Sequence, residues 1–427
     1  TGIGVAVPLT QTPTTQPTNL TSSSPNMIIS FFRDISLNPA AFNDWTSPEY
    51  RAATWMANHP DFIFERLSQN RRLVRYALAT LYYSTGGENW TKQKNWLNYT
   101  ANECDWEQDM VNNQCRGPYN TLWLLTLEDY GLNGTLPADI GLLTDIEWLE
   151  LPSNQIHGTI PSELGLVSKM QLLSFGNNSL TGTIPNEFGN FASCLVLDLP
   201  NNLMEGSLPS SLEKLKLLTH FHLHNNGFSW NLPTQFGRFT DLKSLLVEDS
   251  GLEGTLMTEI GKLVALEKLQ VSNNPKFGGT FATELGKLQK LSSLDVSNCG
   301  FDGSLPTEIG SMTSMEELFL KDAKISGELP SEMGLLTHLN ILHLEENILL
   351  SGTIPTEFGQ LTAMEELDMA GCNFGSTLPS EIGRMTRLTS LRLNNNSLSG
   401  TIPREILLLA NTTLHTFEYY GNNFLSR

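Results

Sequence analysis

The sequence predicts an α/β solenoid, in which similar turns of chain stack into a curved superhelix with a parallel β-sheet on its concave side. Three observations predict it: a repeat of 24 residues, alternating apolar residues within each repeat, and recurring asparagine, glycine and proline positions. The pattern LxxLxLxxNxL begins thirteen times, in steps of 24 residues apart from two steps of 25 and a last step of 26. We therefore expect about thirteen strands, in turns that begin at Leu122, Ile146, Met170, Cys194, Leu218, Leu242, Leu266, Leu291, Met315, Leu339, Met364, Leu388 and Leu414.

Each recurring position has a physical role in the turn. Alternate residues of a strand point to opposite faces, so the leucines of LxxLxL point into the core while their neighbours face solvent. A buried asparagine can bond to backbone groups of adjacent turns, which predicts a ladder along the stack. Glycines such as Gly158 permit the sharp turn that follows, and prolines such as Pro161 fix the extended return path. The ladder is interrupted where other residues replace the asparagine, at Tyr130, Ser250, Cys299, Ala323 and Cys372.

Composition and periodicity divide the chain into three parts. Residues 1–25 contain seven Thr, three Ser and four Pro without periodicity, and we expect a flexible tether there. Residues 26–121 are expected to form a helical amino-terminal cap, because residues 26–85 have helical patterning. Residues 122–427 are expected to form one continuous solenoid.

A group of arginines lies in the helical part of the cap. Arg71, Arg72 and Arg75 precede the segment YALATLYY. They would bind an anion or, in the reading that we favour, form a solvated helix face that pairs with the many acidic side chains.

Charge and motifs exclude several function classes. The net charge is −19, and binding to nucleic acid needs a basic face, so we expect no nucleic-acid partner. No apolar run approaches the roughly 18 to 20 residues that span a bilayer. The sequence contains no phosphate-binding glycine loop, zinc-protease helix, nucleophile elbow or kinase signature. We therefore expect no enzyme and no cofactor.

The five cysteines divide into a pair and three single residues. Cys104 and Cys115 are close in sequence and lie just before the repeats, which favours a disulfide over two free thiols. Cys194, Cys299 and Cys372 occupy positions that the repeat buries, and we expect reduced core residues there.

Glycosylation acceptors favour the secretory pathway. The chain starts at Thr1, which we interpret as a processed mature chain or a fragment, with any signal peptide removed. Together with the cap disulfide, the acceptors predict a glycoprotein that is extracellular or at the cell surface. The Asn-x-Ser/Thr acceptors are Asn19, Asn89, Asn98, Asn133, Asn177, Asn395 and Asn411.

The repeat consensus LxGTIPxELGxLxxLxxLxLxxN resembles the plant-type leucine-rich repeat. That type occurs in ectodomains of plant receptor-like kinases, in polygalacturonase-inhibiting proteins and in algal, notably diatom, surface proteins. The segments SPEYRAATWMANHP and RRLVRYALATLYYSTGGENWTKQKNWL, followed by ECDW and Cys115, are similar to the amino-terminal cap of such proteins, and RYALATLYYSTGG fits the algal members best. The resemblance covers residues 27–427 and implies an extracellular recognition protein. The usual W-x-G-V-x-C appears as Trp106 followed by EQDMVNNQC, which lengthens this loop.

A row of apolar residues occupies solvent-facing strand positions in the first four turns. Such positions on a solenoid normally carry polar residues, so an apolar row about 15 Å long, or three strand spacings, indicates a contact surface. It would bind a partner or lie beneath the cap loop. The row consists of Trp123, Leu124, Trp148, Leu172 and Val196.

The fifth turn extends this surface with three histidines on one face of one strand, His220, His222 and His224. Asp198 and Glu248 are expected beside His222 and His224 on the flanking strands. Imidazoles suit zinc, copper or nickel, but alternate strand residues lie nearly 7 Å apart, which is awkward for three ligands of one ion. A pH-sensitive contact patch and no special role are the alternatives, and we assign no metal.

Towards the carboxyl end the same face becomes acidic. Such a field would attract a basic partner or calcium, although solubility alone accounts for it. The last turn has no recognisable capping segment, so we expect either residues beyond Arg427 or a partner at this end. The acidic residues are Glu316, Glu317, Glu345, Glu346, Glu365, Glu366 and Asp368.

Two functions remain. The first is an extracellular recognition module that binds a protein, peptide or glycan on the concave face. The second is a structural glycoprotein subunit that contacts neighbouring subunits of a surface assembly.

Overall fold

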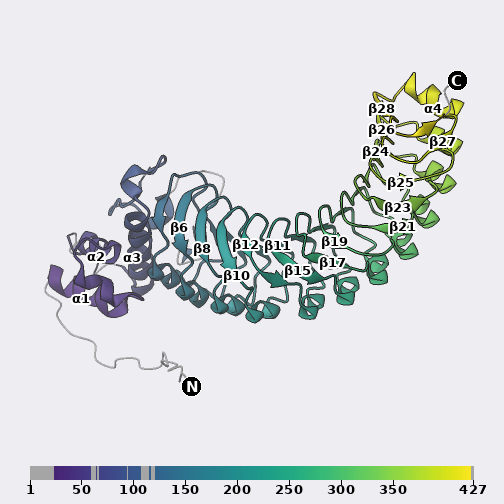
Figure 1. Cartoon of the computed structure of the whole chain (residues 1–427). Helices are drawn as coiled ribbons and strands as arrows, with labels where there is room; N and C mark the ends of the chain where they lie inside the picture. The colour runs from purple at the N-terminus through teal and green to yellow at the C-terminus, as the bar shows by residue number, and fades with distance from the viewer. Residues whose placement is uncertain are drawn as a thin grey trace.

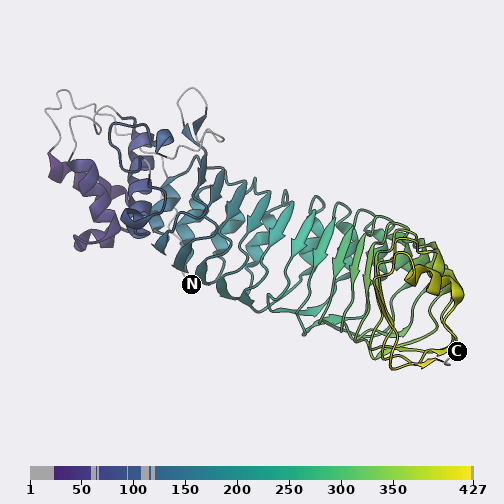
Figure 2. The same cartoon turned by 90° about the horizontal axis from the view of Figure 1, so that it is seen from above.

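The computed structural model describes residues 24–58, 64, 67–93, 95–106, 115–116 and 121–424. Its solenoid turns form one curved arc, with the helical cap at the amino end and short 3-10 helices along the outer side (Figure 1). Seen from above, the strands of the long sheet lie side by side along the arc (Figure 2). The tether predicted for residues 1–25 lies almost wholly outside the described residues.

Three α-helices form the cap: α1 (Pro25–Ile35), α2 (Pro48–Ala57) and α3 (Gln69–Ser84). Proline opens α1 and α2, where the missing N–H is not needed. The side chains of Ser47 and Ser68 accept hydrogen bonds from the first turns of α2 and α3. Their apolar faces meet in a small core that includes Ile28, Phe32 and Tyr76.

The long sheet contains thirteen parallel strands, and each strand pairs with its neighbours in chain order. This confirms the α/β solenoid and the strand number that the repeat predicted. The strands are β3 (Leu124–Thr126), β5 (Trp148–Glu150), β7 (Leu172–Ser174), β9 (Val196–Asp198), β11 (His220–His222), β14 (Ser244–Leu246), β16 (Lys268–Gln270), β18 (Ser293–Asp295), β20 (Glu317–Phe319), β22 (Ile341–His343), β24 (Glu366–Asp368), β26 (Ser390–Arg392) and β28 (Thr416–Glu418).

Shorter strands pair along the side of the arc. They form sheets of five, four, three and two strands, and an antiparallel pair, β1 (Cys115–Arg116) with β2 (Thr121–Leu122), precedes the first turn. Along the chain, a 3-10 helix follows the side strand of each turn, from η4 (Ala138–Leu142) to η14 (Ser380–Arg384). Before the last turn, α4 (Arg404–Ala410) takes the place of the 3-10 helix. The side strands are β4 (Asn133–Thr135), β6 (Gln155–Thr159), β8 (Ser179–Gly182), β10 (Leu203–Gly206), β12 (Gly227–Phe228), β13 (Trp230–Asn231), β15 (Leu252–Thr255), β17 (Phe277–Gly279), β19 (Gly300–Phe301), β21 (Ser326–Glu328), β23 (Leu349–Gly352), β25 (Asn373–Phe374), β27 (Ser399–Gly400) and β29 (Asn423–Phe424).

The asparagine ladder has the form that the sequence predicted. Asn226 is typical: its Oδ1 accepts from the N–H of Met204 at 3.1 Å, and its Nδ2 donates to the carbonyls of Leu199 and Leu223 at 3.0 Å. Where cysteine takes the position, the thiol is a weaker donor, as in the bond from Cys299 Sγ to the Val271 carbonyl at 3.2 Å. The cysteine thiol therefore replaces only part of the hydrogen bonding that an asparagine amide provides at this position.

The cysteines are arranged as predicted. Cys104 and Cys115 form a disulfide, whereas Cys194, Cys299 and Cys372 are free and buried. Burial raises the pKa of each of these three thiols to about 12, so they remain protonated at neutral pH.

The cap joins the solenoid through buried polar contacts. Asp139, in the first 3-10 helix of the solenoid, is fully buried and accepts hydrogen bonds from Ser36 Oγ, the Leu37 N–H and Tyr76 Oη at 2.9, 2.7 and 2.9 Å. These bonds fix the angle between the cap and the first turn, because the carboxylate cannot be left unpaired in the core.

Two of the three arginines of the cap pair with an acidic residue, as we expected. The pairing is largely buried, however, and does not form the solvated helix face that we predicted. Arg71 and Arg75 both bond to Glu103, whose side chain is 3% exposed, at 2.6 and 3.0 Å. Although burial acts to raise the pKa of Glu103, the two guanidinium groups outweigh it and leave this pKa below its ordinary value. Arg72 lies over the Phe64 ring, 4.2 Å from its centroid.

The last turn is only partly covered. Leu414 is buried, but Phe417 and Phe424 are half-buried and Tyr419 is 42% exposed, although Phe417 and Tyr419 occupy core positions of the repeat. Residues 425–427 lie outside the described part of the chain.

Candidate interaction surface

The register of the long sheet aligns the apolar row that the sequence singled out. Leu124, Trp148, Leu172, Val196 and His220 are successive Cα partners across β3, β5, β7, β9 and β11. Trp148 is 36% exposed, and Leu172 and Val196 are half-buried. Their side chains lie on the concave side because the alternate residues of the same strands fill the core.

Trp123 and Trp148 form an aromatic pair at the amino end of this row. Their ring centroids are 5.6 Å apart with an interplanar angle of 66°, a favourable edge-to-face arrangement. Trp123 itself is half-buried. The pair presents a large, stiff apolar surface that ends the row beside the cap.

The structure changes the membership of the predicted row at two residues. Leu124 is 2% exposed, so the first turn offers no leucine to a partner, and the exposed row begins at Trp148. This burial supports the cap-packing alternative for the first turn alone. Leu195, which the sequence analysis missed, is 38% exposed beside Val196 and widens the row. Leu195 occupies the same repeat position as Trp123, which the sequence did single out, so the repeat frame carried the signal.

The histidines continue the row with polar contacts. His222 Nδ1 lies 3.1 Å from Asp198 Oδ1, and His222 Nε2 lies 2.9 Å from Ser244 Oγ. Ser174 Oγ donates to Asp198 Oδ2 at 2.6 Å. A hydrogen-bonded line therefore crosses the four strands β7, β9, β11 and β14 and fixes the orientation of the imidazole. As the sequence predicted, Asp198 lies beside His222.

The order Asp198, His222, Ser244 is that of a nucleophilic triad, but its surroundings do not suit catalysis. The Ser244 N–H donates to the Thr219 carbonyl at 3.1 Å within the sheet, so it cannot stabilise an oxyanion. Ser244 is also 7% exposed, which hinders an approaching substrate. We interpret the line as a polar network that stiffens this part of the surface.

Electrostatics in this network favour an ionised carboxylate. Burial acts to raise the pKa of Asp198, but the hydrogen bonds from His222 and Ser174 outweigh it and leave this pKa below its ordinary value. Burial and the neighbouring His222 lower the pKa of His220. Its Nδ1 lies 2.9 Å from Thr219 Oγ1.

The third histidine has a looser arrangement. His224 Nδ1 lies 3.9 Å from Glu248 Oε1, beyond hydrogen-bond distance. Among the described residues, no three or more His, Cys, Asp or Glu side chains converge in a way that could hold a metal ion.

In the carboxyl-terminal half of the sheet, some of the acidic residues lie near basic side chains. Arg392 lies 3.3 Å from Asp368 and 3.8 Å from Glu418, and Lys321 lies 3.6 Å from Glu345. His343 Nε2 lies 3.6 Å from Glu366. Two of the seven acidic residues, Glu345 and Asp368, are thus paired with a lysine or arginine within the sheet.

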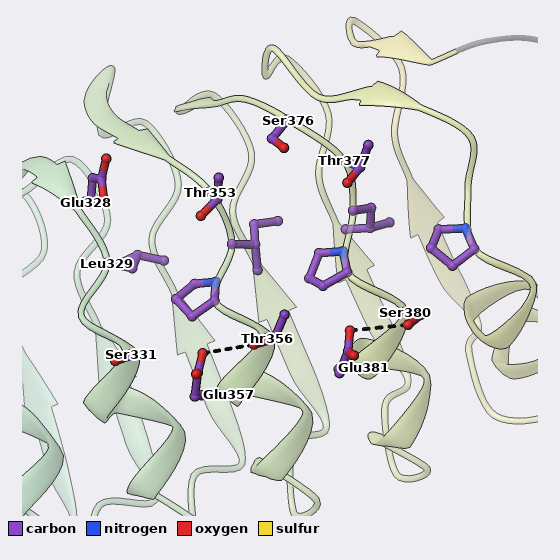
Figure 3. A pocket seen from close by; sticks show the side chains of 15 residues that line it. Glu328, Leu329, Ser331, Thr353, Thr356, Glu357, Ser376, Thr377, Ser380 and Glu381 are labelled. Carbon is purple, nitrogen blue, oxygen red and sulfur yellow. Dashed lines mark hydrogen bonds between the residues drawn. The ribbon is translucent and has the colours of Figure 1, made fainter.

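A hollow of about 800 Å³ lies elsewhere, on the segments that lead from the side strands to the 3-10 helices of turns near the carboxyl end (Figure 3). Its polar residues bond to their own neighbours: Thr356 Oγ1 to Glu357 and Ser380 Oγ to Glu381, both at 3.2 Å. The same Ser/Thr–Glu bond recurs in other turns, as in Thr258 and Glu259. We therefore interpret the hollow as a consequence of the repeat rather than a ligand site.

Comparison with known proteins identifies the repeat. Residues 298–408 match the family described as leucine-rich repeat region, and residues 169–191 match the family described as leucine rich repeat. No curated protein matches the chain in a sequence search. The fold is that of a leucine-rich-repeat solenoid.

Two of the solved structures that the chain resembles are receptors. A plant peptide hormone receptor, RGFR1, solved in complex with RGF2, is 30% identical with a TM-score of 0.66, over 72% of this chain and 52% of the receptor chain. A TDR receptor is 28% identical with a TM-score of 0.64, over 71% of this chain and 56% of that chain. The chain thus spans about half the length of these receptors.

The fold is not confined to plants. A leucine-rich-repeat protein of Leptospira interrogans is 27% identical with a TM-score of 0.53, over 73% of this chain and 82% of that chain. Within the part of our chain that the structure describes, no helix has the length and apolar character to cross a membrane.

Proposed function

We propose that this chain is an extracellular recognition module that binds a peptide or protein on the amino-terminal half of its concave sheet. The observation that carries the proposal is the exposed apolar row Trp148, Leu172, Leu195 and Val196, next to the oriented histidines of β11. Apolar side chains gathered at neighbouring solvent-facing positions of successive strands indicate a contact surface.

The surface has the features of an interaction hot spot. Aromatic anchors surrounded by half-buried neighbours carry much of the energy of protein interfaces. His220 and His222 add polar groups at the border of the apolar row, and Asp198 and Ser244 hold His222 in one orientation. The similarity to a plant peptide hormone receptor supports a peptide or protein partner over a glycan.

The glycosylation acceptors are compatible with this use of the sheet. Asn89, Asn133, Asn177, Asn395 and Asn411 are exposed and Asn98 is half-buried, whereas Asn19 lies outside the described residues. Each of the six described acceptors lies outside the strands of the long sheet. Attachment at these positions would leave the strand residues themselves unmodified, although Asn177 lies only three residues after β7. Secretion of the chain is therefore part of the proposed function.

Truncation of the central aromatic tests the proposal. Immobilised chain is used to capture secreted and cell-surface proteins, and the partner identified by mass spectrometry is then titrated against variants. We expect Trp148→Ala to weaken binding by about 2 kcal/mol, roughly 30-fold, because the anchor loses its buried area.

The matched control is Phe319→Ala, a half-buried aromatic on β20 of the same sheet. It should leave the affinity within about threefold of wild type, since it lies outside the apolar row. Unchanged affinity of Trp148→Ala, with the fold intact, would assign the row to packing against the cap.

A structural role in a surface assembly is the second candidate. Leu203, Ile348 and Leu349 are 63%, 71% and 61% exposed, and Leu203 and Leu349 begin side strands β10 and β23. Apolar side chains on this lateral side suit contacts between neighbouring solenoids. Light scattering across a concentration series distinguishes the two roles: self-association that Leu203→Ser and Leu349→Ser abolish supports assembly, whereas a monomer supports recognition.

A further inference from the structure

A second aromatic surface lies on the cap, away from the concave sheet. A hollow of about 370 Å³ is bordered by Trp45, Tyr50, Arg51, Trp55, Asn58 and Tyr83. Trp45 is 75% exposed, while the other tryptophan among these residues, Trp55, is half-buried. An indole normally contributes a large buried area to a folded protein, so its display on the surface needs an explanation.

The turn that presents Trp45 is well ordered by hydrogen bonds. Asp44 Oδ1 accepts from the Thr46 N–H and from Thr46 Oγ1, at 2.8 and 2.7 Å. Ser47 Oγ donates to the Ala41 carbonyl at 2.8 Å and accepts from the Tyr50 N–H at 3.1 Å. Trp45 therefore extends from a fixed turn, and its exposure does not follow from a loose loop.

The remaining walls of the hollow are also held in place. The guanidinium of Arg51 lies 4.2 Å from the Tyr83 ring centroid and 3.8 Å from Glu88. The Trp55 ring packs edge-to-face on Trp106, with centroids 5.7 Å apart. A ligand would therefore meet a preformed surface and would have little to order on binding.

We propose that this hollow binds a neutral oligosaccharide, with one sugar ring stacked on the indole of Trp45. The apolar C–H face of a pyranose matches a flat aromatic ring, while the hydroxyl groups at its edge need hydrogen-bond partners. Asn58, Arg51 and the tyrosine hydroxyl groups at the border are polar groups of the required kind. The site goes beyond the recognition role proposed for the concave sheet and does not depend on it.

Charge determines the class of sugar. None of the residues that border the hollow is acidic, and Arg51 would repel a cationic ligand. The Glu88 carboxylate lies 3.8 Å from this guanidinium, so an anionic sugar that approached Arg51 would also approach a negative charge. A neutral ligand avoids repulsion by either charge.

Size separates a sugar from the main alternative, a proline-rich peptide. Such peptides lie extended along aromatic grooves and use several successive pockets. A hollow of about 370 Å³ is instead near the lower end of the range for small-ligand sites, about 300 to 1,000 Å³, and suits one or two sugar rings.

The experiment probes the full chain with an array of neutral and uronic-acid oligosaccharides, alongside a proline-rich peptide. The best neutral oligosaccharide is then titrated while tryptophan fluorescence is recorded. We expect saturable binding that Trp45→Ala weakens at least about tenfold, because this ring supplies the stacking surface. Trp148→Ala should bind the sugar like wild type, which keeps this test separate from that of the concave sheet.

Thermal unfolding establishes that Trp45→Ala is folded, as the exposure of this side chain leads us to expect. Tyr83→Ala, at the border of the same hollow, is a second variant that should also weaken binding of the sugar. Failure of every neutral oligosaccharide to bind overturns the proposal, and so does equal affinity of Trp45→Ala and wild type. Binding of the proline-rich peptide alone, or of uronic-acid sugars in preference to neutral ones, also overturns it.

Discussion

The two halves of the concave sheet share one backbone frame and differ in the side chains that predominate on their solvent-facing positions. In the amino-terminal half, Trp148, Leu172 and Val196 form an apolar row that ends in histidines held by hydrogen bonds. In the carboxyl-terminal half, carboxylates such as Asp368 alternate with cations such as Arg392. The same strand positions are used in both halves, so the repeat sets the fold while the residues between the leucines remain free to vary.

The interior differs between the halves as well. The ladder is unbroken over the four turns from Asn154 to Asn226, whereas Tyr130 interrupts it before this stretch and Ser250, Cys299, Ala323 and Cys372 interrupt it later in the chain. A cysteine retains one weak bond where asparagine makes at least three. The four turns that carry Trp148, Leu172, Val196 and His220 thus also have an unbroken ladder in their core.

The largest expected effect concerns this ladder. Asn226→Ala should lower the free energy of unfolding by about 3 kcal/mol, because it leaves a buried N–H and two carbonyls without partners. Cys299→Ala should cost about 1 kcal/mol or less, since it removes one bond and little volume. Denaturant unfolding of both variants measures the difference, and equal losses would show that the two halves are bonded alike.

A smaller effect should appear with pH around Asp198. Its folded pKa lies below the ordinary value, so it contributes stability above the unfolded pKa of about 3.9, and that contribution is lost as pH falls through the folded pKa. Asp198→Asn should lower stability at pH 7 by about 1 kcal/mol, and the gap to wild type should close as pH falls below about 4.

Melting curves recorded from pH 7 to pH 3 test this expectation. Ser174→Ala, which removes one donor to the same carboxylate, should show the same trend at smaller amplitude. Parallel curves for wild type and Asp198→Asn across the whole range would show that the network does not stabilise the ionised carboxylate.

The smallest effect is expected in the acidic half. Arg392 is 40% exposed, and solvent screens its pairs with Asp368 and Glu418. Arg392→Ala should therefore change stability by less than about 1 kcal/mol, and salt should reduce the difference further. A loss as large as that of Asn226→Ala would overturn our description of this half as a surface network.

The sequence predicted the features that the repeat determines. The strand positions, the ladder, the buried thiols and the neighbours Asp198 and His222 follow from a period that repeats thirteen times. Burial of the row beneath the cap was one of the two alternatives that the sequence left open, but its restriction to Leu124 and the choice of Glu103 as the partner of two arginines depend on how the cap folds and could not be predicted. The hollow at Trp45 likewise arises from packing between separate segments of the cap. The similarity of the cap to algal surface proteins stays a prediction.

Oxidative footprinting of the chain with its captured partner compares the two halves in one experiment. We expect the partner to protect Trp148 and His220, while Phe319 and His343 on the same sheet keep their rate of oxidation. These side chains react readily and lie on β5, β11, β20 and β22, so they report on both halves. Protection of Phe319 and His343 without protection of Trp148 would contradict the assignment of the binding surface to the amino-terminal half.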